Sequence, residues 1–301
     1  MDDCFCGKKA VVFLHYSGRL LCEEHFITMF DKRVRRTVRE RRMLRKGDRI
    51  AIGLSGGKDS CTLLHSLAQL KNDIPIELVA VTINEGIDGY REKTLKTARR
   101  ECEKLGIEHM VFSFKEGAGK TMDEIAKEKD RIPCSYCGVL RRYLLNKGAR
   151  EAGANKLAVG HNLDDIAQTV LMNIMRSEPS RLARFSEGLD GGSRFVQRIR
   201  PLMRTPEKEI AVYAMLKGIE LYNRDCPYAP FAFRGHVRKM LNETEERYPG
   251  TKFKIVSSFF EMEDGLRSMY KDKASDCKSC GEPCSDEICM FCKTVKSFSI
   301  K

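Results

Sequence analysis

The chain has 301 residues, of which 42% are hydrophobic and 32% are charged, so it can bury a core and global disorder is excluded. No run approaches the roughly 18 apolar residues of a membrane-spanning helix, and the start MDDCFCGKK lacks the basic and apolar parts of a signal peptide, so we expect a cytoplasmic protein without membrane contact. The formal net charge is +12, and residues 32–46 hold nine Lys or Arg and one Glu. Such a block indicates a polyanionic partner such as nucleic acid, with a solvated helix face as the alternative.

Short apolar runs alternate with amphipathic segments along the middle of the chain. Phe30, Val34 and Val38 recur four residues apart and indicate a helix within the basic segment 30–45. Buried strands are predicted at 49–55, 76–84, 109–114 and 156–162. Helices are predicted at 59–70, 90–105, 138–151 and 164–175, and over most of 205–270 with a break at 226–230. Strands that alternate with helices need crossover connections, which predicts an α/β fold with a doubly wound parallel sheet.

Both ends of the chain carry clustered cysteines with the spacing of metal ligands. Without a secretory signal, thirteen cysteines favour metal binding over a disulfide framework. Two ligand pairs separated by a loop are typical of structural zinc, and they are Cys4, Cys6, Cys22 and His25 at one end and Cys277, Cys280, Cys289 and Cys292 at the other. Cys284 is a fifth thiol in the second set. We therefore expect two Zn²⁺ ions, in an N-terminal module at 1–27 and a C-terminal module at 271–301, around a catalytic domain at 28–270.

A glycine-rich loop joins the first predicted strand to its helix. Its residues are Ser55, Gly56, Gly57, Lys58, Asp59 and Ser60. Backbone N–H groups in such a turn, together with a helix N-terminus, form a cradle for an anion, and the lysine adds a positive charge. The loop is neither a Walker A motif nor a dinucleotide fingerprint, because an aspartate follows the lysine and the other glycines are missing. The sequence therefore predicts a phosphate-binding loop of another kind.

Two later segments follow strands and should reach the same edge of the sheet, where doubly wound folds bind ligands. Their candidate ligand-binding residues are Asn84, Gly86, Gly160 and His161. Asp164 is expected to cap the next helix. Asp165 is expected either to cap as well or to reach the metal or the substrate.

At this point SGGKDS resembles the PP-loop of the ATP pyrophosphatases, also called adenine nucleotide α-hydrolase-like enzymes. The resemblance implies that ATP is cleaved between its α and β phosphates, that the substrate becomes an adenylate and that Mg²⁺ accompanies the reaction.

Three further cysteines lie inside the middle of the chain. Cys134 and Cys137 form a CxxC pair before an Arg-rich helix, and Cys226 stands alone in DCPYA. The pair can be a redox disulfide, it can hold a metal together with Cys226, or all three can be buried apolar residues. The residues alone leave these alternatives open.

The whole pattern resembles the TtuA-type tRNA 2-thiolation enzymes of the TtcA/TtuA family. The resemblance runs from the first cysteine cluster through SGGKDS, GHNLDD, IRPL (199–202) and DCPYA to the last cluster. It implies that Cys134, Cys137 and Cys226 hold a 4Fe-4S cluster, and three thiolates leave one iron open for sulfur. Cys61 and Cys102 are candidate fourth ligands, but both fall on predicted helices and are interpreted as core. The resemblance also implies tRNA as the substrate, a ubiquitin-like thiocarboxylate protein or free sulfide as sulfur donor, and a homodimer.

The resulting hypothesis is an ATP-dependent sulfurtransferase that adenylates the C2 oxygen of a tRNA uridine and replaces it with sulfur. Its candidate catalytic residues are the three cysteines with Lys58, Asp59, Asp165 and Arg141. Arg141 lies one turn after Cys137 and has an RNA-phosphate or solvent contact as its alternative role. Aromatic residues over 228–233 can stack on the base or belong to the core. Other hypotheses are a PP-loop ligase such as tRNA-lysidine synthetase, an amidotransferase, thiolation through a cysteine persulfide without a cluster, and a non-catalytic RNA-binding protein. The sequence does not say whether uridine 34 or 54 is the target.

Overall fold

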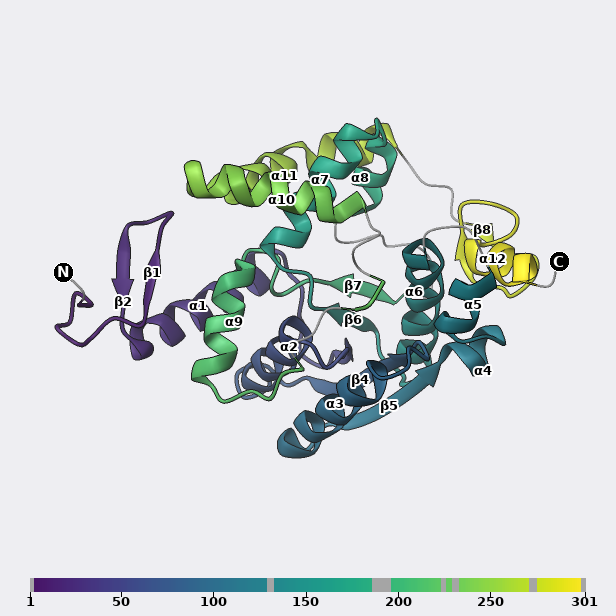
Figure 1. Ribbon diagram of the computed structural model, residues 1–301, viewed down its shortest axis with the longest axis horizontal. Helices are drawn as coiled ribbons and strands as arrows, with labels where there is room; N and C mark the ends of the chain where they lie inside the picture. The colour runs from purple at the N-terminus through teal and green to yellow at the C-terminus, as the bar shows by residue number, and fades with distance from the viewer. Residues whose placement is uncertain are drawn as a thin grey trace.

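A five-stranded parallel sheet forms the centre of the computed structural model, which describes residues 3–128, 133–185, 196–222, 226–228, 233–270 and 275–298. The strand order is β5-β4-β3-β6-β7 (Figure 1). The strands are β3 (Arg49–Gly53), β4 (Glu77–Asn84), β5 (Glu108–Ser113), β6 (Lys156–Val159) and β7 (Gln197–Ile199). The predicted doubly wound parallel sheet is thus confirmed.

Helices cover both faces of this sheet, because alternate residues of each strand point to opposite sides. On β3, Ile50 and Ile52 face one core and Ala51 faces the other. The first core is shared with α1 (Glu23–Glu40), α2 (Lys58–Leu70), α3 (Arg91–Leu105) and α9 (Glu207–Leu216). The second is shared with α4 (Phe114–Ala118), α5 (Met122–Glu128) and α6 (Pro133–Glu151).

A group of helices packs together beyond the β6 and β7 side of the sheet (Figure 1). It consists of α7 (Leu163–Met175), α8 (Pro179–Phe185), α10 (Phe233–Arg247) and α11 (Thr251–Met269). In the described part of the chain, none of the helices has the length and apolar character that crossing a membrane requires.

The two cysteine-rich ends lie at opposite ends of the long axis of the molecule (Figure 1). The N-terminal module contains the hairpin β1 (Val12–Leu14) and β2 (Arg19–Leu21). The C-terminal module contains β8 (Ser275–Asp276), β9 (Pro283–Cys284) and α12 (Met290–Phe298). The 27/28 boundary expected from the sequence falls inside α1, because His25 already sits in the first turns of that helix.

Several elements differ from the sequence prediction in their limits. The first sheet strand ends at Gly53 rather than at residue 55, and the helix expected at 138–151 begins at Pro133. Proline suits the first turn of a helix, because its missing N–H has no partner there in any case. Cys134 and Cys137 therefore lie within α6 and not before it. The edge strand β7 was not predicted, since three residues with two polar side chains give no hydrophobic signal.

The connections leave the sheet in opposite directions after β3 and β6. From β3 the chain moves to β4, whereas β6 lies on the other side of β3 and leads to β7. The carboxyl ends of β3 and β6 therefore flank the switch point of the sheet, where doubly wound folds bind their ligands.

Candidate functional site

The SGGKDS loop turns tightly between β3 and α2 at this switch point. The hydroxyl oxygens of Ser55 and Ser60 lie 3.0 Å apart, and the Ser55 backbone N–H donates to Ser60 Oγ over 3.1 Å. Gly56 has φ +83°, and a Cβ there would overlap the carbonyl oxygen of Thr94. Gly57 immediately precedes α2 in an extended conformation. Glycine is therefore required at position 56 by both conformation and packing, and the loop presents backbone N–H groups and a helix N-terminus to an anion.

Lys58 of this loop is held between two carboxylates. Its Nζ lies 3.1 Å from Asp59 Oδ2 and 2.7 Å from Glu207 Oε1 at the start of α9. Asp59 Oδ1 also accepts a hydrogen bond of 3.0 Å from Asn162 Nδ2. Desolvation acts to lower the pKa of Lys58, but the charges of Asp59 and Glu207 raise it above its usual value, so the lysine stays positive. Neither Glu207 nor Asn162 was proposed as a site residue from the sequence.

The GHNLDD segment after β6 approaches the loop closely. A Cβ on Gly160 would lie 3.1 Å from backbone atoms of Asp59 and Ser60, which explains the glycine. Helix α7 is capped by Asn162, whose side chain accepts from the Asp165 N–H while the Asp165 side chain accepts from the Asn162 N–H.

The expectation that Asp164 caps α7 is therefore wrong. Its carboxylate instead accepts from the Glu207 N–H over 2.8 Å and forms a buried ion pair with Lys252. Asn162, Asp164 and Asp165 are all of residue types that can cap a helix, and the point where β6 ends places Asn162 at the N-cap position.

Asp165 combines this capping role with an unusual electrostatic environment. Burial, with the added repulsion of Asp59, raises the pKa of Asp165 to about 6. Arg234 of α10 lies 3.8 Å from its Oδ1. Asp59, Asp165 and Glu207 thus place three carboxylates beside the phosphate loop, and Mg²⁺ characteristically binds one or two carboxylates together with substrate phosphates. The donor set fits that ion.

The loop after β4 lies on the other side of the phosphate loop. Asn84 Oδ1 accepts from the Gly86 N–H over 3.0 Å, and a Cβ on Gly86 would collide with Thr121. Buried Arg91 donates to the carbonyl oxygen of Ser55 over 2.9 Å and pairs with buried Glu85 at 2.8 Å. The sequence singled out Asn84 and Gly86, but the structure also reveals this Arg91–Glu85 pair.

The three internal cysteines come together beside Glu85, although 89 residues separate Cys137 from Cys226. Cys134 Sγ lies 3.3 Å from the carbonyl oxygen of Tyr228, two residues after Cys226. Burial raises the pKa of Cys137 to about 11, with contributions from Glu85 and from the other two thiols. The pKa of Cys226 is likewise raised by burial and by Cys134. The structure thus gathers three thiols of one site from two segments.

The donor chemistry of this trio fits an iron–sulfur cluster with three protein ligands. Thiolates are the ligands such clusters prefer. Cys61 and Cys102 lie elsewhere, on α2 and α3 beside Glu101, and burial raises the pKa of each to about 12. Their interpretation as core residues agrees with their burial. The remaining cysteines belong to the two terminal modules, so among the described residues no fourth cysteine joins the trio.

Arg141 and His161 interact with each other but lie in different electrostatic surroundings, because acidic groups surround Arg141 and arginines surround His161. Desolvation lowers the pKa of Arg141, but the charges of Cys137 and Glu85 raise it above its usual value. Desolvation and the charges of neighbouring arginines hold the pKa of His161 well below its usual value. The neutral imidazole therefore lies among fixed positive charges, the nearest of which come from Arg200, Arg198, Arg234 and Arg141.

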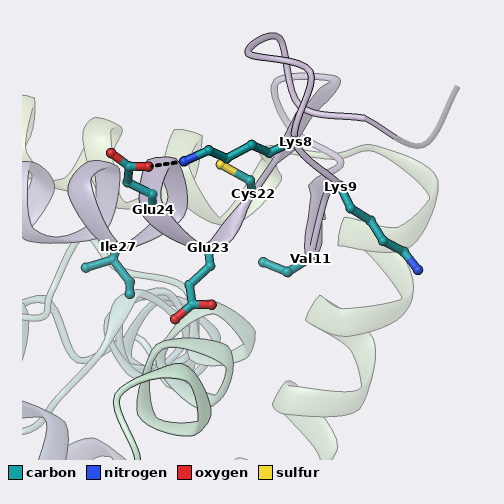
Figure 2. A pocket seen from close by; sticks show the side chains of 7 residues that line it. All are labelled: Lys8, Lys9, Val11, Cys22, Glu23, Glu24 and Ile27. Carbon is teal, nitrogen blue, oxygen red and sulfur yellow. Dashed lines mark hydrogen bonds and ion pairs between the residues drawn. The ribbon is translucent and has the colours of Figure 1, made fainter.

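The ligand atoms of the N-terminal set lie within 4.8 Å of one another, close enough to hold one metal ion. Cys6 Sγ and Cys22 Sγ lie 3.8 Å apart, and His25 Nδ1 lies 3.4 Å from Cys4 Sγ and 3.3 Å from Cys22 Sγ. A zinc ion that binds thiolates at about 2.3 Å holds them about 3.8 Å apart. A hollow of about 370 Å³ adjoins this module, and Figure 2 shows Lys8 reaching past Cys22 to pair with Glu24 at 2.7 Å.

The C-terminal set is equally compact. The ligand atoms of Cys277, Cys280, Cys289 and Cys292 all lie within 4.8 Å of one another. Cys280 Sγ is 3.6 Å from Cys289 Sγ, a separation that suits zinc. Cys284 lies outside this set, and its thiol donates to the carbonyl oxygen of Asp286 over 2.7 Å.

Comparison with known families gives two matches that together cover most of the chain. Residues 26–245 match the PP-loop domain, and residues 3–27 match the N-terminal LIM domain of the 2-thiouridine synthetase TtuA.

Individual relatives match over nearly their whole length. The chain is 38% identical to the tRNA 2-thiolation protein NcsA of Haloferax volcanii, over 97% of each chain. It is 37% identical to the tRNA-5-methyluridine(54) 2-sulfurtransferase of Pyrococcus horikoshii, over 96% of this chain and 92% of that protein. Among solved structures, the U34-tRNA thiolase NcsA of Methanococcus maripaludis with its [4Fe-4S] cluster superposes with a TM-score of 0.85 at 35% identity, covering 100% of this chain and 98% of that one.

Proposed function

The chain belongs to the PP-loop family and, within it, to the TtuA/NcsA group of tRNA 2-thiolation proteins, and we propose from this that it is an ATP-dependent tRNA-uridine 2-sulfurtransferase. One observation carries the proposal: a phosphate-binding loop and a three-thiol site share one edge of the sheet. Arg91 joins them, because it donates to Ser55 of the loop and pairs with Glu85, whose charge reaches the thiols. Activation by ATP and delivery of sulfur can therefore act on one bound base.

Each half of the site has a role in the proposed reaction. The loop amides and Lys58 hold the β and γ phosphates of ATP and stabilise the charge that develops on pyrophosphate. Asp59 and Asp165 would hold Mg²⁺, which would offset the negative charge of the phosphates. The C2 oxygen of the uridine attacks the α phosphorus, the bond to the β-phosphate oxygen breaks and pyrophosphate leaves. A sulfur nucleophile then adds to C2, and AMP departs with the former C2 oxygen.

The three cysteines provide the site of sulfur delivery. When bound, a 4Fe-4S cluster held by Cys134, Cys137 and Cys226 would supply an iron without a protein ligand, to which sulfide can bind. Arg141 lies beside these thiols and balances their negative charge. Free sulfide or a thiocarboxylate protein would supply the sulfur.

Two closed zinc sites and a basic surface complete the proposal. The terminal modules have too little apolar core of their own and depend on zinc to fold. The basic block lines a groove of about 760 Å³ along the end of α1, whose apolar floor includes Val38, Leu44, Leu70 and Ile74. This groove suits an RNA backbone. None of the thirteen cysteines, all of which lie in the described residues, forms a disulfide, which suits work in the reducing cytoplasm, and we place the protein there. The family resemblance also implies a homodimer.

The test is Cys226→Ala in protein purified without oxygen. We expect iron to fall from about four atoms per chain and thiolation of tRNA to be lost, while ATP binding stays unchanged. Cys102→Ala, which removes a buried thiol outside the trio, is the matched control and should keep both iron and activity. Retained thiolation in the Cys226 variant would remove the three-cysteine site from the mechanism.

A further inference from the structure

A cavity of about 460 Å³ lies between α6, β7 and the C-terminal zinc module. Four arginines line it, and they come from three separate elements: Arg142 from α6, Arg184 from α8, and Arg198 and Arg200 from β7 and the residue after it. Apolar and aromatic walls are supplied by Tyr143 and Phe291, whose rings stack with centroids 3.6 Å apart. The zinc module is thus built into the wall of this cavity.

A backbone contact holds Arg142 and Arg198 together, and neither is paired with an acid in the described part of the chain. Arg198 Nη2 donates to the carbonyl oxygen of Arg142 over 3.2 Å, which fixes both residues on one wall. Desolvation, followed by the charges of Arg200, Arg142 and Arg141, lowers the pKa of Arg198 to about 10. Desolvation and neighbouring arginines also lower the pKa of Arg142. Holding these positive charges close together therefore costs free energy in the folded protein.

Among the described residues that line the cavity, the single carboxylate is already occupied. Glu282 accepts from Asn146 Nδ2 over 3.0 Å with one oxygen and pairs with Arg150 through the other. Asp286, which lies near Arg184, pairs with Lys293 at 2.6 Å. No ion pair joins Arg142 or Arg198 to a carboxylate in the part of the chain that the structure describes. The cavity is therefore suited to an anion that the lining residues themselves do not supply.

The position of the cavity indicates which anion it binds. Arg141 is adjacent in sequence to Arg142, and the charges of Cys137 and Cys226 act on it. Arg198 and Arg141 also both act on His161 at the end of β6. The phosphates of ATP are accounted for by the SGGKDS loop after β3, two strands away from β7 in the sheet order. An RNA strand that delivers a base to the thiols would carry its next phosphates past these arginines.

We propose that the arginine cavity binds backbone phosphates of the RNA strand beside the target uridine, with Arg142 and Arg198 as positioning residues. The proposal rests on the proposed function for the identity of the RNA, and it gives the C-terminal zinc module a role in substrate binding. Arginine suits this task, because its planar guanidinium forms two parallel hydrogen bonds to one phosphate.

The test measures binding of a tRNA transcript to the full, metal-loaded protein over a range of salt concentrations, without ATP or sulfide. In Arg142→Ala/Arg198→Ala we expect the dissociation constant to rise about tenfold at physiological salt. Each lost phosphate contact also reduces the slope of log affinity against log salt by about 0.7–0.9, so the slope should fall by about 1.4–1.8. Arg142→Lys/Arg198→Lys should restore the slope but only part of the affinity.

The control is Lys96→Ala/Arg99→Ala, which removes the same charge from exposed positions on α3 and should leave the slope unchanged. Zinc and iron content should equal those of the wild type in every variant. A slope that stays at the wild-type value in Arg142→Ala/Arg198→Ala, or falls equally in the control, overturns the proposal. The proposal is also overturned if Arg142→Ala/Arg198→Ala loses pyrophosphate binding but keeps RNA binding, because the cavity would then be a site for a free anion. Because this test measures binding and not turnover, its result does not depend on the outcome of the Cys226→Ala test.

Discussion

Asp165→Asn should make the protein more stable and less active. The carboxylate is 27% exposed, caps α7 and lies close enough to Asp59 for the two charges to repel each other. Its pKa rises from 3.8 to about 6 on folding, mainly through burial. At 1.36 kcal/mol per pKa unit, keeping this group ionised above pH 7 costs about 3 kcal/mol. Partial exposure screens the charge, so we expect the asparagine to gain about 1–2 kcal/mol.

The sign of the pH dependence follows from the direction of this pKa change. Between pH 4 and pH 6 the folded protein holds a proton on Asp165 that the unfolded chain has already lost, so the wild type loses stability as the pH rises through this window. The asparagine has no such titration. The stability difference between variant and wild type should therefore be about half as large at pH 5 as at pH 8.

Urea unfolding followed by circular dichroism, at pH 5 and pH 8 without Mg²⁺ or ATP, measures this difference. Asn can still accept the hydrogen bond from the Asn162 N–H, so the capping interaction remains. Asp264→Asn, on the exposed surface of α11, is the control and should change stability by less than about 0.5 kcal/mol at either pH. Thiolation should fall at least about 100-fold, because the carboxylate is proposed to hold Mg²⁺. A variant less stable than the wild type at pH 8 would refute the reasoning.

Three further predictions concern the phosphate loop and the zinc modules. Gly56→Ala should raise the KM for ATP more than about tenfold, because φ at this position is positive and the added Cβ would overlap Thr94. Gly57→Ala is the control and should keep the loop folded, because its Cβ would lie no closer than 3.6 Å to Ser55 Oγ. Equal KM values for the two variants would contradict this prediction. Glu207→Gln removes one partner of Lys58 and should lower the KM for ATP about two- to fivefold in steady-state assays, and a higher KM would show that the glutamate assists binding. Cys280→Ser should reduce zinc from two atoms to one per chain by atomic emission and lower the melting temperature, since α12 packs on α6; two retained zinc atoms would exclude Cys280 as a ligand.

The sequence was most informative where a short segment contains the whole chemical pattern. SGGKDS is continuous in sequence, and each terminal set consists of two closely spaced ligand pairs, so local spacing already implies the geometry. The parallel sheet was predictable for the same reason, since its central strands are continuous apolar runs. The short edge strand β7 lacks such a run and depends on pairing with β6 to exist at all.

What the sequence could not supply were partners brought in by the tertiary fold. Glu207 reaches Lys58 from 149 residues away, and Asn162 reaches Asp59 from 103 residues away. Nothing in the local pattern around Glu207 marks it as a neighbour of the phosphate loop, whereas Asn162 belongs to the GHNLDD segment that was expected at the same edge of the sheet. The arginine cavity is the same kind of feature, because Arg142 and Arg198 are unremarkable in a basic sequence until β7 pairs beside β6.

The carboxylates around Lys58 give the loop a charge balance that has consequences for nucleotide binding. Asp59 and Glu207 neutralise the lysine, so the loop can fold without a bound anion. When ATP enters, its phosphates must compete for a lysine that already has two partners, and Mg²⁺ becomes necessary to offset the carboxylates that then face the phosphates. Arg91 is less free to respond, because it is buried and holds Ser55 and Glu85 at once. Arg91 therefore forms a fixed contact between the phosphate loop and the side of the site that holds the thiols.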